Sequence, residues 1–257
     1  MANYYFLSDA HLGTPVVADR RQHELALVAW LDMAAKDADA IFLLGDIFDF
    51  WFEYRTVVPK GFNRLLGKLC EITDRGIEVH FFIGNHDLWT FGYLEQEIGL
   101  VVHRQPTVMT LCEKQFFLAH GDGLHDKSCS FSLLRSIFHN KLCQKAFAAL
   151  PPAVGLNIGH RWSANNRRKH DAMNVPFLGE EHEALALFAK EHAASHTVDY
   201  YIFGHRHILL HLMLNRQNQM IILGDFIHEF SYAVFDGSAV TLHHFNPPVS
   251  VMYNQTS

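Results

Sequence analysis

Six short apolar runs are spaced along the chain, and each one ends in a polar cluster that contains Asp, Asn or His. The runs are YYFLSDAH (4–11), AIFLLGD (40–46), EVHFFIGNHD (78–87), QFFLAHGDG (115–123), DYYIFGHRH (199–207) and MIILGDF (220–226). Nearly continuous apolar segments of this length are typical of strands that are buried on both faces. The pattern therefore predicts six buried strands with polar side chains at their C-terminal ends.

Helical periodicity appears between several of these strands. Segment 19–38 has apolar residues at three- and four-residue spacing, such as Val28 and Leu31, and segments 62–73 and 181–194 have a similar pattern. Alternating strands and helices predict a layered α/β fold in which loops at the strand ends form the functional site.

Two regions depart from this alternation. The C-terminal runs YAVFDG and VTLHHF predict a hairpin around Asp236-Gly237 that closes a second sheet. Residues 124–177 contain no good strand pattern and shift towards cationic helix, as in HRWSANNRRKHD at 160–171. We interpret residues 124–177 as a helical cap insertion within a single domain that spans 1–257.

Composition narrows the class of protein. The 257 residues fit one large domain, or one domain with a sizeable insertion. Hydrophobic residues make up 49% and charged residues 19%, which suits a well-filled core and not a disordered chain. The formal net charge of −6 argues against broad nucleic-acid binding.

Cysteine spacing and the apolar pattern bear on the cellular compartment. The four cysteines (Cys70, Cys112, Cys129 and Cys143) show no paired spacing, which favours free thiols in a reducing compartment. The N-terminus has no secretory pattern, and no apolar stretch is long enough to span a membrane. We therefore expect a cytoplasmic protein.

The chain has 19 histidines, and several of them stand at the predicted strand ends. The strand-end clusters are Asp9-x-His11, Gly45-Asp46, Gly84-Asn85-His86-Asp87, His120-Gly121-Asp122 and Gly204-His205-Arg206-His207. Carboxylate, imidazole and amide groups, with no thiolate among them, suit divalent Mn²⁺, Fe²⁺ or Zn²⁺. Alternate residues of an extended segment point the same way, so Asp9 with His11 can present two ligands, and a second such pair follows Gly204. Asp46 could bridge two ions about 3.5–4 Å apart, as two-metal hydrolases require.

Each cluster by itself has an ordinary explanation. A Gly-Asp pair after a strand is usually a turn or a helix cap, and single histidines at strand ends are common. The polar Asn85, His86 and Asp87 directly after HFFIG are harder to explain, because they have no packing purpose there. Five such clusters in one chain favour a shared metal site over five separate turns.

The series D-x-H, G-D-x-x-D, G-N-H-D, H-G-D and G-H-x-H resembles the calcineurin-like metallophosphoesterase superfamily, over residues 9–207. The resemblance implies two mixed β-sheets sandwiched between helices and two divalent ions, with Mn²⁺ preferred to Fe²⁺ or Zn²⁺. It implies that one ion is held by Asp9, His11, Asp46 and His207, and the other by Asp46, Asn85, His120 and His205.

The same resemblance implies a mechanism. A hydroxide that bridges the two ions would attack phosphorus in line, because the ions lower the pKa of bound water. His86, paired with Asp87 or another acceptor, would assist departure of the ester oxygen. No serine or cysteine motif suggests a covalent nucleophile.

The stretches GDIFDFWFEY (45–54), HRWSANNRRKH (160–170) and ILGDFIHEFSYAVFD (222–236) resemble one branch, the UDP-2,3-diacylglucosamine diphosphatases of lipid A synthesis. This implies hydrolysis of UDP-2,3-diacylglucosamine, a nucleotide-diphospho-lipid sugar, to 2,3-diacylglucosamine 1-phosphate and UMP. It also implies a peripheral protein on the inner face of the bacterial inner membrane. Proteobacterial members of the branch have Arg at the position of His86, where this chain keeps the general G-N-H-D form.

Several residues are candidates for binding such a substrate. Trp51, Phe52 and Phe131 could line a groove for acyl chains, and Asp126 joins the predicted substrate-binding set. The basic residues that could hold phosphates, or dock on anionic headgroups at roughly 1 kcal/mol each, are Arg161, Arg167, Arg168 and Lys169.

Other interpretations stay open at this point. The chain could be a soluble metallophosphodiesterase or nucleotide-sugar hydrolase of the same superfamily with a non-lipid substrate. A non-enzymatic scaffold is disfavoured, because every ligand position is filled. The aromatic run at Trp51 and Phe52 fits core packing as well as it fits a lipid groove, and the basic cluster fits a solvated helix face. No nucleic-acid partner is expected, and the oligomeric state is left open.

Overall fold

The computed structural model describes residues 2–125, 136–172 and 176–248, and the side chains of residues 166–172 are outside this description. Two predicted substrate-binding residues, Asp126 and Phe131, lie outside the described residues. The side chains of Arg167, Arg168 and Lys169 do so as well.

The first of two sheets has six strands in the order β11-β10-β1-β2-β3-β4. Its strands are β1 (Tyr4–Leu7), β2 (Ala40–Leu44), β3 (Glu78–Phe82), β4 (Val101–His103), β10 (Ser231–Phe235) and β11 (Val240–His244). The runs predicted as buried strands form its centre, where β1, β2 and β3 pair in parallel. All five residues of β2 are buried, as its continuous apolar run predicts.

The second sheet has five strands in the order β5-β6-β7-β9-β8. Its strands are β5 (Thr107–Leu111), β6 (Lys114–Leu118), β7 (Tyr200–Phe203), β8 (Leu209–Met213) and β9 (Gln219–Leu223). Strand β7 lies between β6 and β9, and it pairs in parallel with both. Both sheets are mixed, because each has antiparallel strands at an edge.

Two features differ from the prediction. The C-terminal hairpin exists as β10 and β11, but β10 pairs with β1, so the hairpin extends the first sheet and does not close a second one. Strands β4, β5 and β8 were not predicted. Strand β4 has only three residues, threonines interrupt the apolar residues of β5, and His211 interrupts the apolar run of β8.

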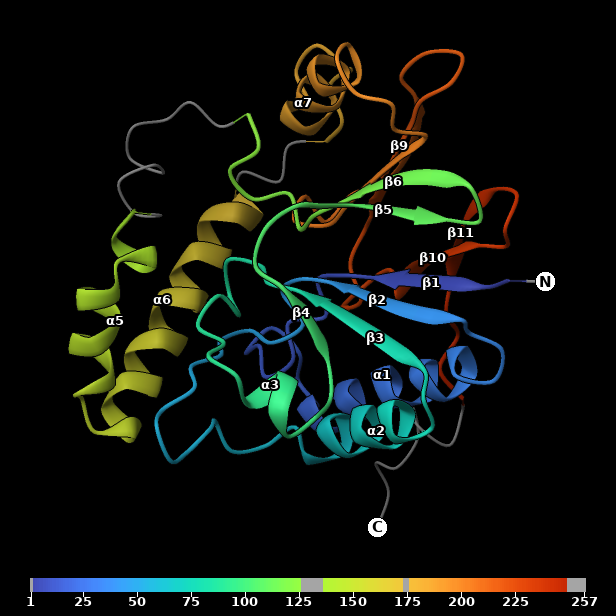
Figure 1. Cartoon of the computed structure of the whole chain (residues 1–257). Coiled ribbons are helices and arrows are strands. Elements are labelled where there is room, and N and C mark those ends of the chain that lie inside the picture. Colours follow the sequence, from blue (N-terminus) through green and yellow to red (C-terminus); the bar gives the residue numbers. More distant parts are fainter. Residues whose placement is uncertain (1, 126–135, 173–175, 249–257) are drawn as a thin grey trace.

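Helices cover the outer faces of both sheets, as Figure 1 shows. They are α1 (Arg20–Ala34), α2 (Asn63–Asp74), α3 (Tyr93–Gln96), α5 (Lys141–Ala148), α6 (Pro152–Ala172) and α7 (Ala184–Ala193). One core cluster joins α1 and α2 to the first sheet, and another joins α7 to the second. A third cluster fills the space between the sheets, with Phe6, Phe42 and Phe116 stacked on one another. The predicted architecture of two mixed sheets between helices is confirmed.

The described part of segment 124–177 is helical and contains no strand. Helices α5 and α6 lie together to one side of the two sheets, as Figure 1 shows. The indole nitrogen of Trp89, in the body of the protein, donates to the carbonyl oxygen of Phe138 (3.0 Å). That the segment is a cap inserted into one domain stays a prediction.

Two glycines with open surroundings give a test of the helix assignment. Gly67 lies inside α2 and a Cβ there would meet no atom within 4 Å, so Gly67→Ala should raise the free energy of unfolding by about 0.5–1 kcal/mol. A Cβ at Gly76 would also meet no atom within 4 Å, but this residue has φ +83°, which strains any residue with a Cβ. Gly76→Ala should therefore lower the free energy of unfolding. Urea denaturation of both variants measures the two free energies of unfolding. Changes of the same sign would contradict the backbone conformations assigned to Gly67 and Gly76.

Candidate metal centre

The polar clusters lie in loops that leave neighbouring parallel strands. They are Asp9 and His11 after β1, Asp46 after β2, Asn85 and His86 after β3, His120 after β6, and His205 and His207 after β7. Main-chain hydrogen bonds tie these loops together: the His11 N–H donates to the carbonyl oxygen of Asp46 (2.8 Å), and the Gly204 N–H to that of His120 (2.9 Å). Because parallel strands end at one edge of a sheet, the clusters converge there.

The backbone at these residues is left-handed and not extended. Positive φ angles occur at Asp9 (54°), His11 (43°), Asp46 (53°), His205 (68°) and His207 (51°). Such angles are uncommon for residues with a Cβ, and they cost of order 1–3 kcal/mol each. Strands β1 and β7 end before these residues. The paired ligands therefore meet because the loops turn sharply, and the argument from alternation along an extended strand is wrong.

Three overlapping groups of side chains bring their possible ligand atoms within 4.8 Å of one another. The groups are Asp9–His11–His207, His11–Asp46–His86 and Asp9–Asp46–His120, and we call these six residues the ligand cluster. All are buried except His207, which is partly exposed. Asp9, Asp46 and His11 each belong to two of the three groups, so these three side chains lie at the centre of the ligand cluster.

Distances within the ligand cluster put Asp46 between two histidines. Its Oδ2 lies 3.3 Å from His120 Nε2 and 3.7 Å from His11 Nε2. On the other side, His207 Nε2 lies 3.1 Å from both Asp9 Oδ1 and His11 Nε2. Asp46 thus has the position that a bridging carboxylate needs.

The two remaining predicted ligands lie next to this cluster. The main-chain N–H of His205 donates to Asp9 Oδ2 (2.9 Å), and its ring centroid is 5.1 Å from that of His120. The Oδ1 atom of Asn85 is buried and makes no hydrogen bond with any described residue. His120 Nε2 is also buried, and it faces Asp46 Oδ2 at 3.3 Å. Buried polar atoms are rarely left unsatisfied, so the amide oxygen of Asn85 fits a divalent metal.

Main-chain carbonyl groups orient two of the histidines. His120 Nδ1 lies 2.8 Å from the carbonyl oxygen of Leu44, and His86 Nδ1 lies 2.7 Å from that of Asp49. A carbonyl oxygen only accepts, so each Nδ1 carries a proton, which leaves Nε2 as the nitrogen that faces the ligand cluster. Metal-binding histidines are commonly held in this way. The hydroxyl of Ser163, on α6, lies 3.1 Å from His86 Nδ1.

Two glycines allow the loops to approach this closely. A Cβ on Gly84 would lie 2.2 Å from Asp46 Oδ1, a distance that no side chain tolerates. Gly45 has φ +85°, and a Cβ there would lie 2.7 Å from His120 Nδ1. The absence of a Cβ at both positions therefore allows the close approach of these loops.

The carboxylates and histidines of the ligand cluster stabilise each other's charged forms. Burial raises the pKa of Asp46, but the nearby rings of His120, His86 and His11 outweigh burial and hold that pKa well below its usual range. Burial likewise opposes ionisation of Asp9, and His207 and His11 outweigh it, so its pKa is also lowered. Conversely, Asp46 and Asp9 overcome burial and raise the pKa of His120. Both carboxylates are anionic at neutral pH, which suits cation binding.

Asp87 has a supporting position and not a reacting one. Its carboxylate accepts hydrogen bonds from the main-chain N–H groups of Ile47 (2.8 Å) and Gly84 (2.7 Å), so it joins two of the ligand-bearing loops. Burial, aided by the charge of Asp46, raises its pKa to about 7, against these hydrogen bonds. Of the two predicted alternatives for the partner of His86, Asp87 or another acceptor, the structure gives the second, because the ring donates to the carbonyl oxygen of Asp49.

An apolar cavity of about 200 Å³ opens beside His86, and we call it the aromatic cavity. The apolar side chains that line it are Phe50, Trp51, Leu88, Trp89, Phe138, Phe147, Ile158 and Trp162. Trp51 therefore lines a cavity as predicted, while it also stacks on Phe48 in the core (4.4 Å between centroids). Phe52 does not line the cavity; it is fully buried behind it, against Phe147 (4.8 Å).

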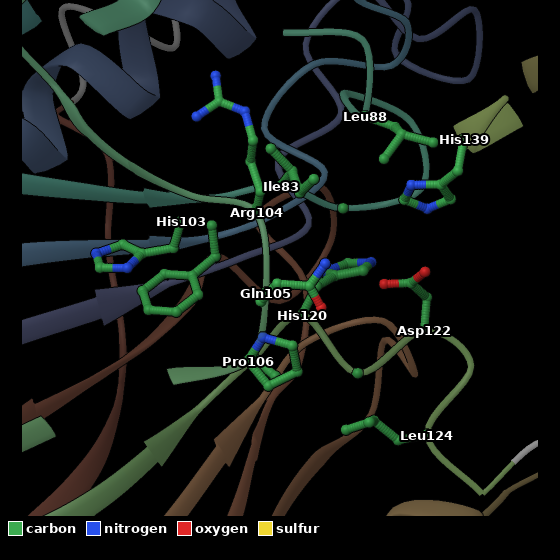
Figure 2. Close-up of a pocket in the computed structure, with 14 residues that line it drawn as sticks. Ile83, Leu88, His103, Arg104, Gln105, Pro106, His120, Asp122, Leu124 and His139 are labelled. Carbon is green, nitrogen blue, oxygen red and sulfur yellow. The ribbon is translucent and has the colours of Figure 1, made fainter. Parts of the chain in front are cut away.

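Figure 2 shows a smaller cavity of about 50 Å³ behind His120, near Arg104, Asp122 and His139. A space of this size holds waters and not a sugar nucleotide. Arg161, the described member of the predicted basic set, lines neither of these two cavities. No helix in the described ranges has both the length and the apolar character needed to cross a membrane.

Comparison with known proteins identifies the class. The family model for calcineurin-like phosphoesterases matches residues 2–209, so the chain belongs to this family, as its motifs predict. The UDP-2,3-diacylglucosamine hydrolase of Porphyromonas gingivalis is 43% identical over 250 residues, which cover 93% of this chain and 95% of that protein. The enzyme of the same name from Escherichia coli O6:H1 is 25% identical over 243 residues, which cover 93% and 98%. A solved dimetal phosphatase from Danio rerio is 15% identical, with a TM-score of 0.46, over 95% of this chain and 99% of that one.

Proposed function

We propose that this protein hydrolyses the diphosphate of UDP-2,3-diacylglucosamine to 2,3-diacylglucosamine 1-phosphate and UMP. The observation that carries the proposal is the aromatic cavity beside His86, because it places an apolar binding surface next to the ligand cluster. A phosphoester and an acyl chain can then occupy neighbouring sites. The 43% identity to the Porphyromonas gingivalis hydrolase supports the same substrate.

The ligand cluster and its neighbours would hold two divalent ions, with Mn²⁺ preferred to Fe²⁺ or Zn²⁺. Asp9, His11, Asp46 and His207 would hold one ion, and Asp46, Asn85, His120 and His205 the other. All of these except Asn85 and His205 belong to the ligand cluster, whose sixth member, His86, is left to act on the substrate. When bound, the ions supply an activated water and neutralise charge on the phosphoryl oxygens. In the reaction, water oxygen bonds to one phosphorus, the bond from that phosphorus to the bridging oxygen breaks, and the electron pair stays on the departing oxygen.

The protein's own residues contribute orientation and a proton. The Asp49 carbonyl holds the His86 ring with Nε2 facing Asp46 Oδ2 at 4.0 Å. From this position His86 would donate to the departing oxygen through Nε2. Asp87 maintains the two loops that carry these groups.

We also infer that segment 124–177 acts as a cap and meets the inner face of the membrane. Leu142 on α5 is 76% exposed and Ile137 is 44% exposed, although both are large apolar residues. Apolar side chains at an interface, with cations nearby, favour peripheral binding to anionic lipid.

Product analysis tests the reaction. With Mn²⁺ and detergent, mass spectrometry and ³¹P NMR should detect UMP and the acylated sugar phosphate in equal amounts, and a chelator should stop their formation. Release of UDP in place of UMP would mean that a different bond is cleaved.

His86→Gln should lower kcat about a hundredfold on diphenyl phosphate, because proton donation to a basic leaving oxygen by a placed side chain is worth 10²- to 10⁴-fold. On bis(p-nitrophenyl) phosphate the loss should be much smaller, since p-nitrophenolate departs without a proton. Steady-state kinetics on the two diesters measure this difference. Equal losses on the two would contradict the assigned role of His86.

A further inference from the structure

Helix α6 lines a second large cavity besides the aromatic one. This polar cavity has a volume of about 580 Å³, and its polar lining comes from Arg20 on α1 and from Asn157, His160, Arg161 and Asn165 on α6. Ile158 and Trp162 of the same helix line the aromatic cavity. One helix therefore faces two cavities of opposite chemistry.

The two cavities are neighbours, and both adjoin the ligand cluster. Phe50 lines the aromatic cavity, and its ring centroid lies 5.8 Å from that of His160 in the polar cavity. Gly13, which also lines the polar cavity, follows His11 by two residues. Asp49 Oδ1 lies 4.0 Å from His11 Nδ1 and also interacts with the ring of His160, so the polar cavity lies close to the ligand cluster.

The polar cavity carries groups that recognise a phosphorylated nucleoside. Arg20 and Arg161 present guanidinium groups, which bind phosphate in a bidentate manner. Asn157 and Asn165 each offer an amide donor and acceptor, which match the edge of a pyrimidine base. The volume lies in the range of small-molecule sites. An acyl chain would leave all of these polar groups unsatisfied.

The electrostatic setting of His160 agrees with this geometry. Burial lowers the pKa of its ring; Asp49 opposes the shift, and the charge of Arg20 adds to it. Arg20, on α1, therefore acts on a side chain of α6 across the cavity. The neutral ring can pack against a base or donate one hydrogen bond.

We propose that the polar cavity holds the nucleoside monophosphate half of the substrate, with Arg20 and Arg161 on its phosphate. This assignment rests on the proposed function, which gives the substrate both a lipid half and a nucleotide half. The acyl half then lies in the aromatic cavity, and the bond that breaks lies between the two, at the ligand cluster.

Calorimetric titration of UMP into the full-length protein with Mn²⁺ tests the assignment. Arg20→Ala and Arg161→Ala should each raise the Kd for UMP about tenfold, the effect of losing one charge-assisted phosphate contact. Arg21→Ala is the matched control: Arg21 is exposed, adjacent to Arg20 on α1 and not among the lining residues, so its loss should leave Kd within twofold of wild type. Circular dichroism of each variant verifies the fold.

Equal UMP affinity in wild type and all three variants, or no binding of UMP to wild type, would overturn the assignment. Sedimentation with phosphatidylglycerol vesicles separates nucleotide from lipid headgroup. If Arg20→Ala and Arg161→Ala weaken vesicle binding and leave UMP affinity unchanged, the cavity serves the membrane and the assignment is overturned.

Turnover of the acylated substrate by wild type, measured in parallel, distinguishes failure of the cavity assignment from failure of the proposed function. If the substrate is hydrolysed but UMP affinity is independent of both arginines, the cavity assignment fails and the proposed function stands. If UMP affinity depends on both arginines but the acylated substrate is not hydrolysed, the nucleotide site stands and the proposed function fails.

Discussion

Asp46→Asn is expected to lower kcat/KM by at least about a thousandfold on every phosphoester substrate. The change preserves the shape of the side chain, and Oδ1 can still accept from the main-chain N–H of His86 (2.8 Å). It removes a negative charge that lies within 4 Å of each of His120, His11 and His86. A neutral amide holds divalent ions far less well than a carboxylate does.

Two further measurements make this test specific. The metal content of the purified variant, determined by mass spectrometry, should fall together with turnover, because Asp46 belongs to two of the three side-chain groups. Asp74→Asn, an exposed carboxylate at the end of α2, is the control and should change neither quantity. A near-wild-type rate in Asp46→Asn would remove the basis for a two-metal site.

Ile158→Asp is expected to lower kcat/KM for the acylated substrate by at least about a hundredfold, with little change for an acyl-free phosphodiester. The substitution places a charge at the aromatic cavity, where an acyl chain would otherwise gain roughly 0.8 kcal/mol for each buried CH₂. The difference between the two substrates is the quantity of interest, because a general loss of fold would affect both.

Val154→Asp provides a matched control for this variant. Val154 lies one turn earlier on α6 and is 46% exposed, against 48% for Ile158, but it does not line the aromatic cavity. Its variant should retain wild-type kinetics on both substrates. If the two variants lose acylated-substrate activity equally, the effect comes from helix α6 as a whole and the cavity is not the acyl site.

Much of the fold follows from the sequence because the central strands are buried on both faces. Runs such as AIFLL in β2 leave no alternative to a buried strand, and the Gly-Asp pair that follows marks its end. Edge strand β8 alternates between exposed and partly buried residues, so tertiary pairing and not local pattern defines it. The hairpin was predicted from the Asp236-Gly237 turn between two strand-like runs, but no local signal indicated that it would pair with β1.

The ligand cluster was predictable for a different reason. Asp9, His11, Asp46, His120 and His207 stand in recognisable motifs, and parallel strands bring strand ends together. Their left-handed backbone could not be inferred, because it depends on bonds between loops, such as that from the Asp9 N–H to the Gly45 carbonyl oxygen (3.1 Å).

The sequence did not predict the residues that orient His86, because they are distant from it along the chain. The contact of Ser163 with His86 spans 77 positions, and that of the Asp49 carbonyl with His86 spans 37. Ser163 lies in the stretch HRWSANNRRKH and Asp49 is the second Asp of G-D-x-x-D, but neither residue was assigned a role from the sequence. The three residues of the aromatic run at 50–52 have different positions. Phe50 and Trp51 line the aromatic cavity, and Phe52 packs behind it.

The central claim is that a two-metal site and the aromatic cavity act on one lipid-linked nucleotide sugar. The most direct test compares turnover of UDP-2,3-diacylglucosamine, UDP-N-acetylglucosamine and bis(p-nitrophenyl) phosphate by wild-type protein, in Mn²⁺ with detergent. The account predicts a strong preference for the acylated substrate and loss of all activity on chelation. Equal or faster turnover of the two acyl-free substrates would contradict it, and would favour a soluble phosphodiesterase whose aromatic residues only fill the core.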